Sequence, residues 1–539
     1  MKKSKLAAVL AVALLTVGAT AACSSGNDSA GTNASPSPGA SSSSDAVNAT
    51  GFPIVNTPIK LTFFAGKAPS APADWNQVEI WKEYAKMTNI DVDFQLTPVD
   101  SLDEKRNLTL SGGELPDAFH TSRLSAMDVA NYGAQGLFIP LDDLIDKYAP
   151  NFKKLMDEHP EIKKGLTMPD GHIYSFPTYY DADFKSVLIG SELWLNEDFL
   201  NALGMKEPTT TDEFYQYLKA VKTGDPNKNG KNDEIPYAAS GIGTLLDQLK
   251  GAWGLGNRGN MHPRVDIDPA TNELRFIPTA PAYKELLQYM NKLYSEGLFI
   301  PDILTVKGPE VNANGKNGLY GSFTGTNARV SFGVADNHYV GAPAFKGPHG
   351  DQLFSRARSP LIDIGAFVIT KANKHPEATV RWIDYFYSEE GSKMFFMGIK
   401  DKSYTENPDG TLSYLPEVAN NSEEMNKYVS FAGGYYPAML TAKTFFGGES
   451  YPENLEAARK VEPYWPQEVW PAFTYTADEL AEFTPLNTDI SKYVDEMTTK
   501  FVTGDASFDQ WDNYVATLEK MGLKRYMEIY KAAYDRYKA

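Results

Sequence analysis

The segment "IKLTFFAG", residues 59–66, is a short run of apolar, aromatic and β-branched side chains that ends in glycine. Such a run predicts a buried strand. The stretch that follows, "DWNQVEIWKEYAKMTNI" (74–90), places Val78, Trp81 and Tyr84 at helical spacing. The chain therefore begins its folded part with a strand followed by an amphipathic helix.

The alternation continues along the chain. "DVDFQLTPV" (91–99) alternates like a second strand, and "EKRNLTLSGGELPDAFHT" (104–121) reads as a helix, a glycine stop and a third strand. Further on, residues 365–396 predict a strand, a turn and an amphipathic helix, and the chain from residue 489 onward is predicted to be helical. Strands that alternate with helices predict the α/β class, with a parallel sheet covered by helices.

Length and charge narrow the class of protein. The chain has 539 residues, 42% of them hydrophobic and 22% charged, which is typical of a soluble globular protein too long for one core. We therefore expect at least two lobes. The formal net charge of -18 argues against nucleic acid as a partner, because polyanion binding requires basic patches. A neutral or cationic ligand fits better.

The N-terminal segment, residues 1–22, predicts a secretory signal peptide. It has three lysines and then an apolar stretch shorter than the roughly 20 residues of a spanning helix. Cys23, the single cysteine, follows directly and resembles the lipidated cysteine of a bacterial lipobox, although Thr20 stands where leucine is usual. The alternative is an ordinary cleavage site with an incidental cysteine.

Residues 23–51 are almost wholly Ser, Gly, Ala, Asn and Pro after the cysteine. This composition cannot bury apolar surface, so it predicts a flexible tether. Two acyl chains on Cys23 would anchor the protein stably. We expect a protein attached to the cell membrane on its extracytoplasmic face, through lipid alone.

The stretch "GDPNKNGKNDEIP", residues 224–236, predicts a calcium site. Calcium is a hard cation that takes six to eight oxygen ligands, and this loop is dense in carboxylates and amides. It is not a complete EF-hand, because Pro236 stands where the bidentate Glu would be. A solvated Asx-rich turn is the alternative. The expected ligands, which would hold the ion in a structural role, are the side chains of Asp225, Asn227, Asn229, Asp233 and Glu234 and the backbone oxygen of Lys231.

Six segments, in order from residue 59 to the C-terminus, resemble the extracellular solute-binding proteins of carbohydrate ABC importers. They are similar above all to the large lipoprotein subgroup that includes the alginate-binding proteins, whose calcium loop has the same pattern. The segments are "WKEYAKMTNIDVDFQLTP", "NLTLSGGELPDAF", "DGHIYSFP", "YMNKLYSEGLFIPD", "ITKANKHPEATVRWIDYFYSEEGS" and "WDNYVATLEKMGLKRYMEIYKAAYDRY".

The resemblance implies a two-lobed, periplasmic-binding-protein-like fold of type II, with hinge-connected lobes and a central ligand cleft. Lobe 1 would comprise residues 52–180 and 361–435, and lobe 2 residues 181–360 and 436–539. The implied partners are an oligosaccharide or other carbohydrate and the permease subunits of an ABC transporter. The protein is expected to act as a monomer, with no nucleic acid.

In the family, loops at strand ends and the crossings between lobes line the cleft. Core packing is the alternative for every aromatic residue among the candidates, and Trp81 and Trp382 are expected to be core. Glycine neighbours in "GAWG" are expected to expose Trp253. Lys400 stands where relatives often carry an acid. The candidate ligand-binding residues are Lys67, Trp75, His120, Arg123, Tyr179, Tyr180, Asp181, Trp253, Phe323, Asn327, Tyr435 and Tyr436.

Two other functions remain open at this point. A surface carbohydrate-active enzyme could use two carboxylates, yet the sequence holds no HExxH, catalytic cysteine or Gly-x-Ser-x-Gly motif. A regulatory lipoprotein that senses a sugar without transporting it could have the same fold. We expect a binding protein that is not an enzyme.

Overall fold

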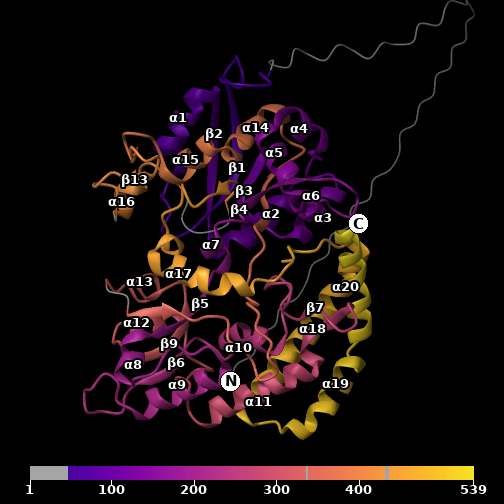
Figure 1. The fold of residues 1–539 in the computed structure, drawn as a ribbon. Coiled ribbons are helices and arrows are strands. Elements are labelled where there is room, and N and C mark those ends of the chain that lie inside the picture. Colours follow the sequence, from indigo (N-terminus) through magenta and orange to yellow (C-terminus); the bar gives the residue numbers. More distant parts are fainter. Residues whose placement is uncertain (1–46, 336–337, 420, 431–435) are drawn as a thin grey trace, which may run out of the picture. The chain divides into compact units, whose positions relative to one another are not determined.

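The structure is a computed structural model that describes residues 47–335, 338–419, 421–430 and 436–539. Cys23, the signal peptide, most of the tether and Tyr435 lie outside these residues. The described part contains two main sheets, each covered by helices, together with two small hairpins (Figure 1). The α/β class predicted from the sequence is confirmed.

The larger sheet has six strands. The predicted strands near residues 59, 91 and 118 are all present, and β1 pairs in parallel with both β2 and β3. In spatial order the strands are β14 (Met439–Leu440), β4 (Ser175–Tyr180), β11 (Leu361–Ile369), β3 (Ala118–Leu124), β1 (Ile59–Lys67) and β2 (Ile90–Pro98).

The predicted parallel sheet holds for the pairs β1–β2, β1–β3 and β14–β4, but β11 runs antiparallel to both β3 and β4. This strand does not follow a crossover helix within the same sheet. It enters after the chain has built the second sheet, so the rule that joins parallel strands through a helix does not govern its direction.

The smaller sheet has four strands. Strand β5 is antiparallel to both of its neighbours, whereas β6 and β9 are parallel. Strand β6 directly follows the predicted calcium loop and was not expected from the sequence. The order is β10 (Tyr339–Gly341), β5 (Glu192–Asn196), β9 (Tyr320–Gly325) and β6 (Ile235–Ala238).

Helices cover both sheets in Figure 1. Those around the larger sheet are α1 (Glu79–Thr88), α2 (Leu102–Gly112), α3 (Ala126–Ala134), α4 (Asp142–Tyr148), α5 (Pro150–Glu158), α6 (Pro160–Leu166), α14 (Pro376–Asp384) and α15 (Glu389–Met397). Those that follow β4 or carry the second core are α7 (Lys185–Ile189), α8 (Glu197–Ala202), α9 (Thr211–Thr223), α10 (Gly243–Leu249), α11 (Pro281–Ser295), α12 (Gly308–Gly315), α13 (Ala328–Phe332), α17 (Pro452–Val461), α18 (Ala477–Thr503), α19 (Trp511–Lys520) and α20 (Leu523–Lys538). The remaining α-helix is the short α16 (Ser422–Met425), and the remaining strands form the hairpins β7–β8 (Val265–Ile267, Leu274–Phe276) and β12–β13 (Tyr404–Glu406, Leu412–Tyr414); short 3₁₀ helices occur between these elements.

An aromatic cluster forms the centre of the first core. Trp382 of α14 is 1% exposed, and its ring lies 5.1 Å from that of Phe63 and 5.6 Å from that of Trp81, with which it stacks. Tyr84 donates a hydrogen bond to the Trp382 carbonyl at 2.8 Å. The expectation that Trp81 and Trp382 are core residues is confirmed.

A second core forms under the smaller sheet. Trp194 of β5 is completely buried, stacks near Phe323, and donates its indole N–H to the Gly325 carbonyl at 2.9 Å. Helices α11, α18, α19 and α20 contribute buried side chains to the same cluster. We call the six-stranded sheet with its core the first lobe, and the four-stranded sheet with its core the second lobe.

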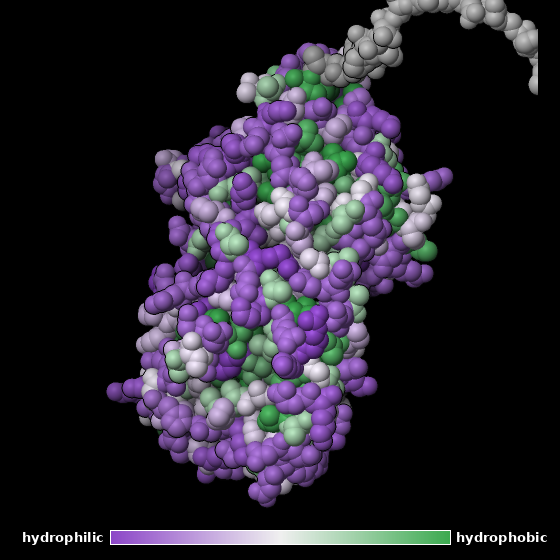
Figure 2. Space-filling model, turned by 90° about the vertical axis from the view of Figure 1, so that its right-hand side faces the viewer, coloured by the Kyte–Doolittle hydropathy of each residue, from purple (hydrophilic) through white to green (hydrophobic). Residues whose placement is uncertain are grey.

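The chain passes between the lobes along neighbouring strands of the larger sheet. The Tyr179 amide donates to the Ala438 carbonyl, that of Tyr180 to Pro360, and that of Asp181 to Leu440. Hydrophilic residues dominate the visible face of the body, with hydrophobic residues in small patches (Figure 2). The first core extends to Leu188, past the expected limit at residue 180, so the lobe limits given above stay a proposal.

Candidate functional site

One edge of the larger sheet brings the ends of several strands together. Strands β1 and β3 are parallel, and β3 and β4 are both antiparallel to β11, so the carboxyl ends of β1, β3 and β4 meet the amino end of β11. In open α/β sheets, ligands bind outside this edge. The polar residues placed there are Lys67, Arg123, Asp181 and Asp363.

The end of β3 is held in an unusual backbone conformation. Thr121 and Arg123 have φ values of 52° and 53°, in the left-handed region that residues other than glycine rarely adopt. The buried guanidinium of Arg106 donates to the carbonyls of Ser122 (2.8 Å) and Arg123 (2.9 Å). Backbone strain of this kind persists where surrounding contacts enforce it, and it concentrates at functional sites. Arg106 therefore fixes the position from which the exposed Arg123 side chain projects.

Asp363 is a buried acid at the same edge, 9% exposed. One carboxylate oxygen accepts from the Gly365 amide at 3.1 Å, and the other has no hydrogen-bond partner among the described residues. Burial raises the pKa of Asp363 to about 7, against the opposing effects of the Gly365 hydrogen bond and the charges of Arg123 and Arg106. Sequence analysis missed this residue; an acid inside the apolar run "LIDIGAFVI" is the signal that could have identified it.

The pKa of Asp363 predicts a dependence of stability on pH. An unfolded aspartate has a pKa of about 3.9, so the folded state binds this proton more tightly. The contribution of the Asp363 proton to the free energy of unfolding is fully present below about pH 4 and is lost as the pH rises to about 7. We expect the free energy of unfolding of the wild type, relative to Asp363→Asn, to fall between about pH 4 and about pH 7 in urea titrations. Identical pH profiles for the two proteins would contradict the assignment.

Most of the aromatic candidates in the first lobe are buried. Trp75 is 3% exposed and packs edge-on against His120 at 5.7 Å. His120 is also buried; burial lowers its pKa to about 3, and its Nδ1 lies 2.7 Å from the Thr121 hydroxyl. Tyr179 is buried, and the ring of Tyr180 lies 6.3 Å from that of Tyr436. The indole nitrogen of Trp75, the Nε2 of His120 and the hydroxyl of Tyr179 have no hydrogen-bond partner in the described part of the chain.

The candidates in the second lobe are buried as well. The expected exposure of Trp253 is wrong, since it is 4% exposed in a 3₁₀ turn and packs against Tyr289. The neighbouring Gly251 allows the backbone to pack closely against Leu353, because a Cβ at position 251 would lie 1.8 Å from the Leu353 carbonyl oxygen. Phe323 is a core residue of β9 in this structure.

Asn327 has a local structural role. It is fully buried, its side-chain oxygen caps α13 by accepting from the Val330 amide at 2.8 Å, and its amide donates to Asn454 at 2.6 Å. Lys400, at the position of the family's acid, is exposed and pairs with Glu406 at 3.0 Å. Among the residues predicted from the sequence, the accessible polar ones are therefore Lys67, Arg123 and Asp181.

The predicted calcium loop folds around its own oxygen atoms. Both carboxylate oxygens of Asp225 face inward and accept from the amides of Asn229 (3.1 Å) and Gly230 (3.0 Å). The Asn229 side chain reaches across the loop to Asp233 at 3.0 Å. Asp225 has a φ of 45° and Gly230 one of 76°, so the turn depends on left-handed backbone at both positions.

Glu234 provides the test of whether these residues fit a cation. It is 7% exposed, one carboxylate oxygen accepts weakly from the Asn227 amide at 3.3 Å, and the other has no partner within the described residues. A buried, unpaired carboxylate oxygen is costly unless a cation is present. No group of three or more His, Cys, Asp or Glu side chains in the described ranges is arranged as a metal site. The loop's donors include two amides and a carbonyl, a set that suits calcium.

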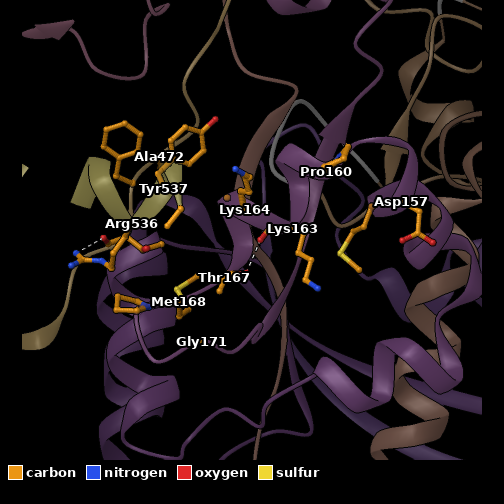
Figure 3. Close-up of a pocket in the computed structure, with 16 residues that line it drawn as sticks. Asp157, Pro160, Lys163, Lys164, Thr167, Met168, Gly171, Ala472, Arg536 and Tyr537 are labelled. Atoms are coloured by element: carbon orange, nitrogen blue, oxygen red, sulfur yellow. Dashed lines mark hydrogen bonds between the residues drawn. The ribbon is translucent and has the colours of Figure 1, made fainter. Parts of the chain in front are cut away.

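A separate cavity of about 590 Å³ lies between α6 and the C-terminal end of α20. Figure 3 shows Arg536 and Tyr537 on one side of it, with Lys163 and Asp157 on the other. Arg536 forms an ion pair with Glu479 of α18. Of the described residues that line this cavity, none belongs to the predicted ligand set.

The two sheets with separate cores, and the strand ends gathered at one edge, define a two-lobed α/β solute-binding fold. The family of bacterial extracellular solute-binding proteins matches residues 72–393, and the chain belongs to this family. Among the described residues, no helix combines the length and apolar character that a membrane span requires.

Individual relatives are similar over nearly the whole chain. The fructooligosaccharide ABC transporter substrate-binding protein FusA of Streptococcus pneumoniae is 31% identical over 502 residues, which cover 89% of this chain and 90% of FusA. A solved structure of the FusA EF-hand mutant with fructo-nystose matches with a TM-score of 0.73 at 28% identity, covering 89% of this chain and 99% of that one. A solute-binding protein of Bifidobacterium longum infantis, described as binding HMO, shares the fold, with a TM-score of 0.76 at 22% identity over 89% and 99% of the two chains.

Proposed function

We propose that this protein captures an oligosaccharide between its lobes and delivers it to an ABC importer. The observation that carries this proposal is the similarity to FusA across 89% of the chain. FusA is a fructooligosaccharide-binding protein, and its structures contain fructo-nystose and kestose, so fructooligosaccharides are the first class to test. A neutral sugar also agrees with the net charge of -18, which disfavours polyanionic ligands.

The sheet edge supplies the groups for such a ligand. Sugar hydroxyls both donate and accept hydrogen bonds, and the edge offers the cations Lys67 and Arg123 beside the acids Asp181 and Asp363. In the proposed mechanism, contacts from both lobes stabilise the closed form more than the open form, and only that difference can drive closure. Those of the remaining predicted ligand residues that the structure describes are buried, and they would contribute if lobe motion exposes them.

The family relatives are transport substrate-binding proteins, which favours binding over catalysis. An enzyme would turn over the glycan, and a sensor without a transport role would bind it but leave uptake unchanged. Incubation with a glycan panel and uptake in a strain lacking the protein separate these alternatives.

We also propose calcium as a structural ion held by Asp225, Asn227, Asn229, the Lys231 carbonyl, Asp233 and Glu234. The unpaired oxygen of Glu234 supports it, as does the EF-hand named for the FusA structure. When bound, the ion would offset two of the three negative charges of the neighbouring carboxylates and hold the loop between α9 and β6. We further propose that Cys23 is lipidated and attaches the protein to the extracytoplasmic face of the membrane. We also propose that the protein acts as a monomer together with the permease subunits of an ABC transporter.

Arg123→Ala tests the sheet edge. Loss of this charged hydrogen-bond donor from the ligand site is expected to weaken oligosaccharide binding about 10- to 100-fold, as measured by isothermal titration calorimetry. The matched control is Arg525→Ala on α20, an exposed arginine paired with Glu482. The proposed edge is wrong if both variants bind as the wild type does.

A further inference from the structure

A loop on the last crossing between the lobes follows the proposed ligand edge. The chain leaves β14 after Leu440, whose carbonyl accepts from the Asp181 amide at 2.9 Å, and it enters α17 at Pro452. Helix α17 contributes Ala457 to the second core. We call residues 446–449, with the sequence "FGGE", the crossing loop. Because β14 runs parallel to β4, this loop follows a strand that ends at the ligand edge itself.

The crossing loop also contacts the corresponding edge of the smaller sheet. Strands β9 and β10 are both antiparallel to β5, and β6 is parallel to β9, so the carboxyl ends of β6, β9 and β10 meet at one edge. Just beyond the end of β9, the Asn327 side chain donates to the Gly448 carbonyl at 3.2 Å. A Cβ at Gly448 would lie 2.5 Å from a methyl group of Val330. The loop therefore joins the carboxyl-end edges of the two sheets, where ligands of α/β folds bind.

Packing against the first lobe fixes the start of the loop. The ring of Phe445 lies 6.3 Å from those of Phe184 and Phe396, two residues of the first core. A Cβ at Gly447 would lie 2.3 Å from the Phe445 ring, so the glycine lets the backbone fold back over that ring. The Ser450 hydroxyl donates to the Phe445 carbonyl at 2.5 Å. The loop therefore has a defined position with contacts to both lobes.

Phe446 is the exposed aromatic residue of this loop. Its side chain is 42% exposed, and its ring meets that of Tyr414 of β13 edge-on at 5.9 Å. The Tyr414 hydroxyl in turn donates to the Phe396 carbonyl at 2.9 Å. The hairpin thus supports the Phe446 ring on one side while much of the ring stays open to solvent. An open aromatic ring offers a flat apolar face against which the C–H groups of a sugar ring can pack.

Glu449 supplies a carboxylate beside this ring. It is half-buried, and its carboxylate has no hydrogen bond or ion pair among the described residues. One of its oxygens would lie 3.2 Å from a Cβ at Gly447. Burial raises the pKa of Tyr436 well above its usual value, and both Tyr180 and the charge of Glu449 add to this rise. The Glu449 carboxylate therefore lies near the tyrosine pair at the ligand edge, and its oxygens are available to accept hydrogen bonds from hydroxyl groups.

We propose that Phe446 and Glu449 form a subsite on the crossing loop that binds a neutral sugar unit. The ring packs against the C–H face of this unit, and the carboxylate accepts from its hydroxyl groups. The inference rests on the proposed function and adds a selection among oligosaccharides.

The selection follows from the charges around the loop. Glu449 and Asp181 are both acids on the side of the sheet formed by β14 and β4. The cations Lys67 and Arg123 lie at the ends of β1 and β3, on the other side of β11. A uronic acid unit on the crossing loop would therefore meet like charges, whereas a neutral unit would not.

The test is calorimetric titration of the full chain with kestose and with trigalacturonic acid. The wild type is expected to bind kestose at least tenfold more tightly than the acidic sugar. Phe446→Ala and Glu449→Gln should each weaken kestose binding about tenfold, and Phe446→Tyr should keep it within about twofold of the wild type. Glu449→Gln should also narrow the preference for kestose over trigalacturonic acid.

Two matched controls lie away from the loop. Phe52 is 44% exposed and packs edge-on against Tyr84 and Tyr385 of the first lobe. Glu273 is an exposed acid in the turn between β7 and β8. Phe52→Ala and Glu273→Gln should bind kestose as the wild type does. Urea unfolding of every variant shows that a loss of binding does not come from a loss of folding.

The outcomes separate the two levels of the proposal. If the wild type binds neither sugar, the proposed ligand class fails and the subsite fails with it. If kestose binds and the affinities of Phe446→Ala and Glu449→Gln equal that of the wild type, the subsite alone is overturned. Tighter binding of trigalacturonic acid than of kestose would overturn the selection for neutral units. Unchanged sugar binding with reduced uptake in cells would also overturn the subsite and assign the loop to a protein partner.

Discussion

Calcium removal is expected to destabilise the second lobe strongly. An ion that binds only the folded state at a free concentration 1,000 times its dissociation constant stabilises that state by about 4 kcal/mol. We expect a chelator to remove this contribution and Glu234→Gln to remove most of the response to added calcium. Glu234 is the sharpest position to change, since its buried oxygen lacks a partner in the described residues. Urea unfolding with and without calcium measures the effect.

The control for this experiment is Glu273→Gln. Glu273 is an exposed acid of the second lobe in the turn between β7 and β8, and its replacement changes the net charge by the same amount. It should leave the calcium response intact. Unfolding curves of the wild type that coincide with and without chelator would show that the loop is only a polar turn.

The substitution Trp382→Ala is expected to lower the free energy of unfolding of the first lobe by about 3 to 5 kcal/mol. The ring is 1% exposed and lies between Phe63 and Trp81, so its removal leaves a cavity that these rigid neighbours cannot fill. Tyr84 donates to the backbone carbonyl of residue 382, a bond that alanine retains. The loss therefore reports on packing rather than on hydrogen bonding.

Trp465→Ala is the matched control for this prediction. Trp465 is half-buried and stacks on Phe354 at 5.7 Å, with solvent able to reach the vacated space. We expect a clearly smaller loss. Calorimetry adds a second readout: Trp382→Ala should move the transition of the first lobe, and calcium that of the second. Equal losses for the two tryptophans would contradict the assignment of the core.

The local pattern of the sequence predicted much of the fold. Strands β1, β2 and β3 and helix α1 have clear periodicity, because each buries one face against a core that lies close in sequence. Strand β6 was missed since it has four residues and contains Pro236. The direction of β11 was missed because it depends on where the chain returns from the other lobe, which local pattern does not encode.

The candidate site was less accessible to sequence reasoning. The calcium loop could be predicted because its oxygen donors are adjacent along the chain, and in the structure Asp225, Asn229 and Asp233 lie close together within it. Trp253 was misjudged, since glycine neighbours permit close backbone contact as readily as exposure. Asp363 is buried because β11 pairs with β3 and β4, which are far apart from it in sequence, and Arg106 acquires its role only when α2 packs against the end of β3.

The position of β11 has a consequence for biogenesis. This strand lies between β3 and β4, yet it is synthesised only after the whole four-stranded sheet has been made. Until the chain as far as residue 369 is available, β3 and β4 lack β11 as a partner, and their unpaired edges invite aggregation. Such long-range pairing also slows folding. The nascent polypeptide thus passes through an interval in which these two strand edges can pair with other chains.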